Sequence, residues 1–366
     1  MYEATGTRDW EDRAHQLRKI LCGIQQTDGG FDIGYDFSFG HMHKAGQSTS
    51  PELVGLVALC EYARLFGSSE VEIAARKAAE WIRMHALDMG NGLVAIPYSP
   101  HTIKEVMVYN GTSFACGALG CYLGQFGGDD HLAHLYSGMI RYLDSVLTID
   151  EKLPGRFWYY SDQSREDLDI LQRAKIDYYH QMQQIEMHAI AQTYKPDTLQ
   201  LAFIRDCAEH VLDIRKSKSV VPYTNDNRYF KGEIHLWGLC SVASGLLEAA
   251  KHCEDRAVAY RNTAEETLEW IVRNGWNGQS FEAVLKDNGD RITPRRYMVR
   301  SDAWVFNSLA AATKHFDSDR WLKTADECFR KMESVHFSGP ENHASNTRKR
   351  IAGAIAQKLK SMLSRS

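Results

Sequence analysis

The sequence predicts an all-α protein in which helical hairpins pack side by side as a ring or a stack. Three observations support this: a repeated phrase, two alternating kinds of helix, and links that alternate between short and long. The phrase recurs roughly every 60 residues and consists of an apolar helix, a short aromatic stop and at once another helix. One hairpin cannot bury its apolar face alone, so repeated hairpins have to cover one another. The stops lie at Phe66, Phe126, Tyr194, His252 and Phe316.

The first expected helix spans residues 8–25, because its apolar residues recur every three or four positions on one face. A glycine-rich stretch over 28–34 ends it and can form only a turn or a short strand. The next helix has Ser50 as its expected N-cap and Pro51 at its first position, where a missing N–H costs nothing. The apolar face of the first helix comprises Trp10, Ala14, Leu17, Leu21 and Ile24.

Two kinds of helix then alternate along the chain. Helices rich in Gly, Ala, Ser and Cys are expected at 52–66, 111–126, 179–194, 235–252 and 302–315. Amphipathic helices are expected at 69–85, 129–146, 197–214, 254–273 and 318–333. Small residues nearly all round a helix imply close contact on both sides. We therefore expect the first set to form an inner layer and the second set an outer layer.

The links between these helices also alternate. The turns from an inner to an outer helix are short, whereas the links from an outer to the next inner helix span about 89–109, 148–177, 216–234 and 274–300. These links are much longer than the typical connection of about 4–6 residues. Long loops gathered on one face of a rigid scaffold are where sites are usually built. We expect one domain over residues 1–340, followed by a basic amphipathic helix over 341–366.

Composition excludes several function classes. The chain has 366 residues, 44% hydrophobic and 25% charged, and its formal net charge of -4 gives no reason to expect a nucleic-acid partner. The eight cysteines contain no C-x-x-C pair, which favours free thiols in a reducing compartment. The start has no signal-peptide pattern, and no apolar run approaches the roughly 18 residues that span a bilayer. A cytoplasmic location is expected.

No cofactor and no metal are expected. His41 and His43 alternate along a strand-like segment close to Asp32 and Asp36, and carboxylates with imidazoles are possible metal ligands. No third ligand follows at a characteristic spacing, so a loop lining the cleft is the favoured interpretation.

The tandem hairpins, together with the phrase over 24–31 that ends in Asp28-Gly29-Gly30-Phe31, resemble the (α/α) toroids. That group includes six-hairpin glycosidases, toroid polysaccharide lyases, glucuronyl C5-epimerases and terpene cyclases. The segment from Arg300 to Trp304 is similar to the Arg-x-x-x-Trp opening of an inner helix in unsaturated-uronyl hydrolases, with Ala303 in place of their glycine. The Asp-rich motifs of terpene cyclases are absent from the sequence. The resemblance implies an (α/α)6-type toroid, incomplete or closed, and a carbohydrate-active enzyme.

Aligning the inner helices on their aromatic stops brings five pairs of first-turn residues to equivalent positions. We expect these residues to meet at the mouth of one ring. The pairs are Ser50 with Glu52, Asn110 with Thr112, Tyr178 with His180, His235 with Trp237, and Arg300 with Asp302.

The richest cluster surrounds His180. Tyr178 and Tyr179 precede it, and Glu186 and His188 follow in the next turns. Gln181, Gln184 and His188 share one face of the same helix. This polar stripe either lines the site or forms a buried hydrogen-bond network that closes the ring.

Two basic, aromatic segments precede the last two inner helices. Sugar rings stack on aromatic faces and planar cations hold carboxylates, so both segments suit an acidic saccharide. A solvated loop with Trp237 in the core, and an Arg300–Asp302 ion pair at a helix start, are the structural alternatives. The candidate binding residues are Glu52, Asn110, Tyr179, Arg228, Lys231, Glu233, Trp237, Arg296, Arg300 and Trp304.

The leading functional hypothesis is an enzyme that abstracts a proton next to the carboxylate of a uronic-acid-containing saccharide, as a lyase or a C5-epimerase, in surface polysaccharide metabolism. His180, His235 and Tyr178 are the expected acid and base groups. A glycoside hydrolase is the second hypothesis; it would use two carboxylates among Glu52, Glu186, Glu233 and Asp302. A non-catalytic glycan-binding or scaffold protein is the third.

The C-terminal segment carries Ile351, Ile355, Leu359 and Met362 at helical spacing among many cations. Three interpretations stay open. It lies on an anionic membrane or docks on a partner protein, it is the sixth inner helix that closes the ring, or it is a loose tail.

Overall fold

The computed structural model describes residues 1–34, 36–39, 41–100, 107–149, 155–162, 175–225, 232–278, 280–292, 299–316 and 319–336. Of residues 37–39, 41–43, 299–300 and 335–336 it describes the backbone and not the side chains. The predicted helix over 341–366 and the division at residue 340 lie outside the described residues.

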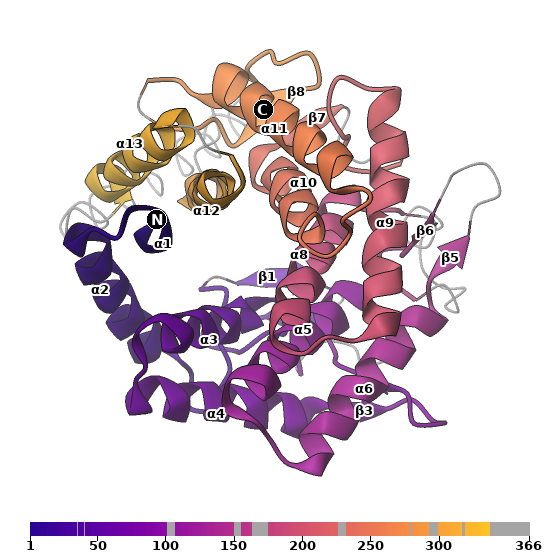
Figure 1. Ribbon diagram of the computed structural model, residues 1–366. Helices are drawn as coiled ribbons and strands as arrows, with labels where there is room; N and C mark the ends of the chain where they lie inside the picture. The colour runs from indigo at the N-terminus through magenta and orange to yellow at the C-terminus, as the bar shows by residue number, and fades with distance from the viewer. Residues whose placement is uncertain are drawn as a thin grey trace, which may run out of the picture.

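The described chain is a two-layer ring of helices, which confirms the predicted all-α toroid (Figure 1). Each inner helix is followed by an outer one that runs back along it. The inner helices are α3 (Val54–Phe66), α5 (Tyr109–Phe126), α8 (Tyr178–Tyr194), α10 (Leu236–Ala249) and α12 (Val299–His315). The outer helices are α2 (Arg8–Ile24), α4 (Ser69–His85), α6 (Asp130–Ser145), α9 (Thr198–Lys216), α11 (Ala257–Gly275) and α13 (Asp319–His336).

Two short helices complete the helical part of the described chain. The α1 helix (Tyr2–Thr5), which the sequence analysis did not predict, precedes the first outer helix, and the 3-10 turn η1 (Pro51–Leu53) leads into α3. No helix in the described ranges is both long and apolar enough to cross a membrane.

The repeated stop is a helix ending followed at once by a helix start. Gly67 and Gly127 end α3 and α5 with positive φ angles of 63° and 74°. The N-cap of the next helix stands one or two residues after this glycine. The Ser68 side chain accepts a hydrogen bond from the Val71 amide of α4, and the Asp129 side chain accepts one from the Leu132 amide of α6. Such caps satisfy orphan helix N–H groups. The chain therefore reverses within a few residues on this side of the ring.

The links on the opposite side form small antiparallel pairs of strands. These are β1 (Phe37–Phe39) with β2 (His41–His43), β3 (Leu87–Asp88) with β4 (Val94–Ala95), β5 (Thr148–Ile149) with β6 (Arg156–Phe157), and β7 (Glu233–His235) with β8 (Val284–Lys286). Bridges outside these strands also join a residue just before an inner helix to the next link: Val108 to Ser161 and Asp177 to Thr224. We call this side, where the inner helices begin, the mouth.

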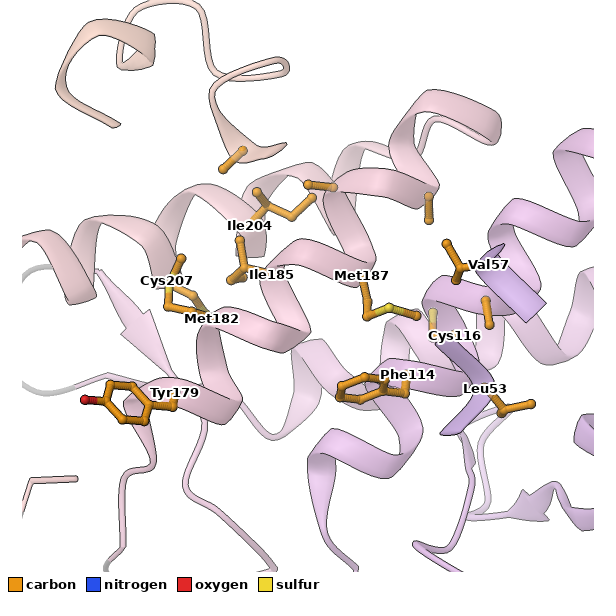
Figure 2. Close-up of a cluster of buried hydrophobic side chains, with 14 of the residues drawn as sticks. Leu53, Val57, Phe114, Cys116, Tyr179, Met182, Ile185, Met187, Ile204 and Cys207 are labelled. Carbon is orange, nitrogen blue, oxygen red and sulfur yellow. The ribbon is translucent and has the colours of Figure 1, made fainter. Parts of the chain in front are cut away.

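Small residues on the inner helices allow close packing. Along α5, Gly117 and Gly124 lie against the backbone of α8, where an added Cβ would stand 2.8 Å from the Met187 carbonyl oxygen and 2.3 Å from that of Tyr194. On the other side of α8, Gly245 of α10 approaches the Met182 carbonyl in the same way. Figure 2 shows the apolar side chains that fill the core around these helices. The sequence prediction of an inner layer from small residues is confirmed.

One detail of the first helix was predicted wrongly. Trp10 of α2 is buried, but Leu17 and Ile24 are 45% and 56% exposed. Trp10 and Leu21 pack inward, so the predicted apolar face is covered only in part.

The Asp28-Gly29-Gly30-Phe31 phrase has a structural role. The Asp28 carboxylate accepts hydrogen bonds from the Gly30 amide (2.9 Å), the Ser48 hydroxyl (2.7 Å) and the Trp81 indole N–H of α4 (3.1 Å). Phe31 is 3% exposed, and the tight turn places its ring against Gly55 of α3. The phrase therefore ties the end of α2 to both helices of the first hairpin.

Replacing Asp28 by alanine is expected to lower the free energy of unfolding by about 2–4 kcal/mol, because it leaves the Ser48 hydroxyl and the Trp81 indole without their acceptor. Urea denaturation of the two proteins measures this. Asp88→Ala is the matched control: Asp88 accepts one hydrogen bond, from the Gly90 amide at an exposed turn, so its loss is expected to cost under about 1 kcal/mol. Equal losses for both variants would contradict the structural role of Asp28.

Candidate active site at the mouth of the ring

The centre of the candidate site is a pair formed by Asp177 and His180 at the start of α8. Asp177 is the N-cap of this helix, and its Oδ1 accepts a hydrogen bond from the His180 amide (3.0 Å). Its Oδ2 lies 2.8 Å from Nδ1 of the same histidine. The N-cap thus fixes both the helix start and the imidazole. Because Nδ1 faces the Asp177 carboxylate, Nε2 is the nitrogen left to exchange a proton with a ligand; the His180 side chain is 17% exposed.

Asp177 is kept ionised although its side chain is 1% exposed. Burial alone would raise its pKa, but His180, the Lys175 ammonium and the hydrogen bonds to the carboxylate hold the pKa well below its usual range. Lys175 Nζ lies 3.0 Å from Asp177 Oδ2 and 4.0 Å from the centre of the Tyr160 ring. The charge of this lysine is therefore shared between a carboxylate and an aromatic face.

Aromatic rings connect His180 to a second histidine. The His180 ring lies 5.4 Å from that of Trp237, which lies 6.0 Å from that of Tyr223. Tyr223 in turn stacks on His235, with centroids 5.1 Å apart and planes 23° apart. His235 Nε2 is 3.4 Å from a carboxylate oxygen of Glu233. The starts of α8 and α10 thus bring two imidazoles, each beside a carboxylate, into one aromatic cluster.

Glu186 lies two turns below the mouth, where α8, α10 and α12 meet. Its carboxyl group accepts hydrogen bonds from the Ser244 hydroxyl of α10 (2.9 Å) and the Asn307 amide of α12 (3.4 Å). Burial raises the pKa of Glu186 to about 8, although the Ser244 hydrogen bond partly opposes the shift. Glu186 is therefore mostly protonated at neutral pH and can act as a proton donor.

This raised pKa predicts a pH-dependent stability. Between the ordinary pKa of 4.5 and the folded value of about 8, the unfolded chain loses the Glu186 proton more readily than the folded chain does. Rising pH therefore destabilises the folded protein across this window, and not below it. Glu186→Gln is expected to melt at a higher temperature than the unsubstituted protein, by a margin that grows from pH 4.5 to 8. Parallel melting curves would contradict the raised pKa.

Both predicted tyrosines at the start of α8 are buried. Tyr178 is 3% exposed, and its ring lies 5.9 Å from that of His210 of α9, behind the inner layer. Tyr179 is fully buried, and its hydroxyl donates to the Val221 carbonyl (3.1 Å). The expectation that Tyr178 points into the mouth was therefore wrong, because successive residues on a helix point about 100° apart. Tyr179, a candidate binding residue, packs from below on the aromatic cluster, with its ring centre 5.0 Å from that of Tyr223 and 6.4 Å from that of Trp237.

Asp302 is also a structural residue. It is 3% exposed, and its Oδ1 accepts a hydrogen bond from the Phe281 amide (2.9 Å), which ties the preceding link to α12. Asp302 lies in the first turn of α12, on the mouth side, but the expectation that its side chain faces the open mouth was wrong, because the carboxylate is buried against the preceding link.

The polar stripe of α8, which comprises Gln181, Gln184 and His188, forms a buried hydrogen-bond network and does not line the site. Gln181 donates to the Cys207 carbonyl of α9 (3.3 Å), and His188 lies 2.9 Å from the Gln200 amide of the same outer helix. Burial lowers the pKa of His188 to about 3, so its imidazole is neutral. Gln184 turns instead towards α5, where it accepts from the Ser113 hydroxyl (2.7 Å).

Near the mouth, two buried side-chain amides each have one polar atom with no hydrogen-bond partner among the described residues. Asn110, in the first turn of α5, is 2% exposed, and its Oδ1 has no hydrogen-bond partner among the described residues. The same holds in the described part of the chain for Nε2 of Gln183, which is also 2% exposed and follows His180 by three residues. Since unpaired buried polar atoms are costly, these amides are suited to receive a hydroxylated ligand.

Other predicted residues are placed only in part. Glu52 and Trp304 are partly exposed, at the starts of α3 and α12. Arg300 belongs to α12, but its side chain is not described, and neither are those of His41 and His43. Arg228, Lys231 and Arg296 lie outside the described residues. Within the described ranges, no group of three or more His, Cys, Asp or Glu side chains is arranged to hold a metal ion.

Five residues of the site were not predicted from the sequence: Lys175, Asp177, Tyr160, Tyr223 and Gln183. For Asp177 a signal was available, because Asp at the third position before a predicted first-turn residue is typical of an N-cap. The others had none: Lys175, Tyr160 and Tyr223 come from links with no periodicity, and Gln183 stands in a helix full of glutamines.

No family model matches the chain, and no curated protein sequence matches it. Solved structures do share its fold. A sugar epimerase from a ruminal bacterium has a TM-score of 0.64 at 12% identity, over 86% of this chain and 83% of that chain. A D-mannose isomerase has a TM-score of 0.60 at 12% identity, over 86% and 84%. A GH76 α-mannanase from Bacteroides thetaiotaomicron has 0.59 at 12% identity, over 88% and 83%. These similarities confirm the (α/α)6 toroid.

Proposed function

We propose that this chain is a carbohydrate-active enzyme that moves a proton at the carbon next to a carbonyl or carboxylate group of a saccharide. The observation that carries the proposal is the Asp177–His180 pair at the mouth, with His235 beside it across a common aromatic cluster. A sugar epimerase, a D-mannose isomerase and a polysaccharide lyase are among the solved structures that share the fold, which supports the same chemistry here.

In the proposed reaction, Nε2 of His180 takes the proton from the carbon, and the electron pair moves onto the neighbouring carbonyl oxygen. Asp177 stabilises the imidazolium that forms, because its carboxylate faces Nδ1. Return of a proton from His235 to the opposite face gives an epimer. Loss of a leaving group from the next carbon gives an unsaturated sugar instead.

The neighbouring side chains suit a sugar. Trp237 and Tyr223 offer aromatic faces on which a pyranose ring can stack. Asn110 and Gln183 offer an unpaired acceptor and an unpaired donor for hydroxyl groups, counted within the described residues. These groups orient the substrate; the histidines move the proton.

A uronic-acid-containing saccharide is the finer substrate proposal. Its carboxylate needs a cation, and Arg228, Lys231, Arg296 and Arg300 precede α10 or begin α12. Lys175 is less suited, because its ammonium faces Asp177. Surface polysaccharide metabolism and a cytoplasmic location remain part of this proposal.

A glycoside hydrolase is the second candidate, since GH76 and GH105 hydrolases share the fold. Hydrolysis needs two carboxyl groups on either side of the glycosidic bond. The Asp177 carboxylate is occupied by the Lys175 ammonium and the His180 imidazole, and the Asp302 carboxylate accepts a hydrogen bond from a backbone amide; both carboxylates are buried. The histidine pair is therefore the better supported catalytic group. A non-catalytic glycan-binding protein is the third candidate, and no buried histidine–carboxylate pair is needed for it.

Incubation with a panel of saccharides in D₂O tests the proposal. The panel contains reducing aldoses, neutral oligosaccharides and uronate-containing oligosaccharides. We expect one of them to gain deuterium at the carbon next to its carbonyl or carboxylate group, measured by mass spectrometry and NMR. A product with new ultraviolet absorption would identify the lyase outcome, because elimination leaves an unsaturated sugar. Hydrolysis without carbon-bound deuterium, or binding without any product, would contradict the proposal.

A further inference from the structure

The Tyr223 side chain contacts both histidine–carboxylate pairs of the candidate site. Tyr223 lies in the link between α9 and α10 and is 8% exposed. Its ring stacks on His235, with centroids 5.1 Å apart and planes 23° apart, and its hydroxyl hydrogen-bonds the Asp177 carboxylate. Asp177 in turn faces His180, whose Nδ1 lies 2.8 Å from Oδ2 of the carboxylate. The two histidines are thus connected through one tyrosine.

Backbone hydrogen bonds fix the position of Tyr223. The link that carries it runs beside the residues that lead into α8, and the residue after Tyr223 forms an antiparallel bridge with Asp177. The Tyr223 carbonyl accepts a hydrogen bond from the Tyr178 amide (3.1 Å). The Asn225 amide donates to the Ile176 carbonyl (3.2 Å), and Oδ1 of the same asparagine accepts from the Ile176 amide (2.9 Å). These bonds hold the Tyr223 backbone beside the N-cap of α8.

Neighbouring side chains confine the Tyr223 ring. The rings of Tyr179 and Trp237 lie edge-on to it, with centres 5.0 Å and 6.0 Å away. The Lys175 ammonium lies 5.5 Å from its centre. Aromatic rings favour such edge-to-face contacts, and a cation is attracted to the face of a ring. Because His235 stacks on it as well, the Tyr223 ring is held in one orientation.

The Tyr223 hydroxyl keeps its proton and donates it in a hydrogen bond to Asp177. Burial and the charge of Asp177 raise the pKa of Tyr223 well above its usual range. A hydroxyl group with such a pKa is a poor acid towards a substrate at neutral pH, but it remains a good hydrogen-bond donor to a buried carboxylate. This chemistry suits a residue that holds other groups in place more than one that moves a proton.

We propose that Tyr223 is a positioning residue that fixes His180 and His235 relative to each other. Its hydroxyl holds the Asp177 carboxylate that orients His180, and its ring holds the plane of His235. The catalytic consequence rests on the proposed function, because one histidine can take a proton and the other can return one only when both face the same carbon. The positioning itself rests on the contacts alone and can be tested without a substrate.

Nuclear magnetic resonance of the two imidazoles tests the positioning in the full chain without a substrate. The signals of isotope-labelled histidine are assigned by their loss in His180→Ala and His235→Ala. Tyr223→Phe removes only the hydroxyl, so Asp177 has one donor fewer; we expect the Nδ1 resonance of His180 to shift and the ring protons of His235 to stay unchanged. Tyr223→Leu should change both, and the His235 ring protons should move downfield because they lose the shielding of the stacked ring.

Tyr260→Phe is the matched control. Tyr260 of α11 is fully buried, and its hydroxyl donates to the Glu209 carboxylate (2.8 Å), which also pairs with an arginine. The variant therefore removes the same kind of hydrogen bond in the outer layer, and it should leave the signals of both site histidines unchanged. An unshifted Nδ1 resonance of His180 in Tyr223→Phe, or an equal shift in Tyr260→Phe, would overturn the proposal.

Turnover separates a failure of this proposal from a failure of the proposed function. With a saccharide that reacts in D₂O, Tyr223→Phe is expected to lower kcat by about 10²-fold, the cost of a misplaced catalytic group, and to leave KM nearly unchanged because the ring remains. A shifted His180 signal without any reacting saccharide would support the positioning and contradict the proposed reaction. Full turnover by Tyr223→Phe, or loss of turnover with an unshifted His180 signal, would overturn the positioning role.

Discussion

Replacing His180 by alanine is expected to lower turnover of the saccharide substrate by about 10²–10⁴-fold, the usual contribution of a positioned acid or base. The effect should fall on kcat more than on KM, because the imidazole moves the proton while Trp237 and Asn110 remain to bind the sugar. Deuterium incorporation at the reacting carbon, measured by mass spectrometry, should fall by the same factor as kcat.

Two variants show whether this loss reflects proton transfer. Asp177→Asn keeps the N-cap but removes the charge that faces Nδ1 of His180, so it should also lower kcat, and it should shift the pH profile. His131→Ala, on the exposed face of α6, should leave kcat unchanged. If His180→Ala retained full turnover, or if the loss were matched by His131→Ala, the proposed base would be wrong.

The sequence could predict the ring because small residues recur in every second helix, where the inner helices pack closely. Glycines such as Gly117 and Gly245 stand where two inner helices touch backbone to backbone, and no larger residue fits. Aligning the inner helices on their aromatic stops also predicted how far each residue lies from the mouth. Ser113 of α5 bonds to Gln184 of α8, and these residues lie 13 positions before Phe126 and 10 positions before Tyr194, so the alignment on the stops matches depth to within about one helical turn.

The same alignment could not predict the direction in which each side chain points. Residues one or two positions apart on a helix point about 100° or 200° apart, and depth alone does not choose between Tyr178 and His180. The structure turns Tyr178 towards His210 of α9 and leaves His180 at the mouth beside Trp237. Link residues were harder still: Lys175 and Tyr223 come from two links that are bridged at Asp177 and Thr224, and no sequence periodicity predicts which links pair.

The largest expected effect on stability is that of Gly124→Ala in α5. A Cβ at this position would stand 2.3 Å from the Tyr194 carbonyl oxygen and 2.6 Å from its carbonyl carbon. Because these are backbone atoms of α8, no side chain can move aside, and the two helices have to separate. We expect the free energy of unfolding to fall by about 3 kcal/mol or more, measured by urea denaturation.

Gly23→Ala distinguishes this clash from the general effect of replacing a helical glycine. Gly23 lies in α2, and an added Cβ there meets nothing within 4 Å, so the change should raise the free energy of unfolding by up to about 0.5 kcal/mol through helix propensity. Opposite signs for the two variants would locate the constraint at the α5–α8 contact. A neutral Gly124→Ala would mean that the inner helices need not touch there. In that case the alignment of first turns, which brings Asn110 and His180 to one mouth, would rest on the links instead.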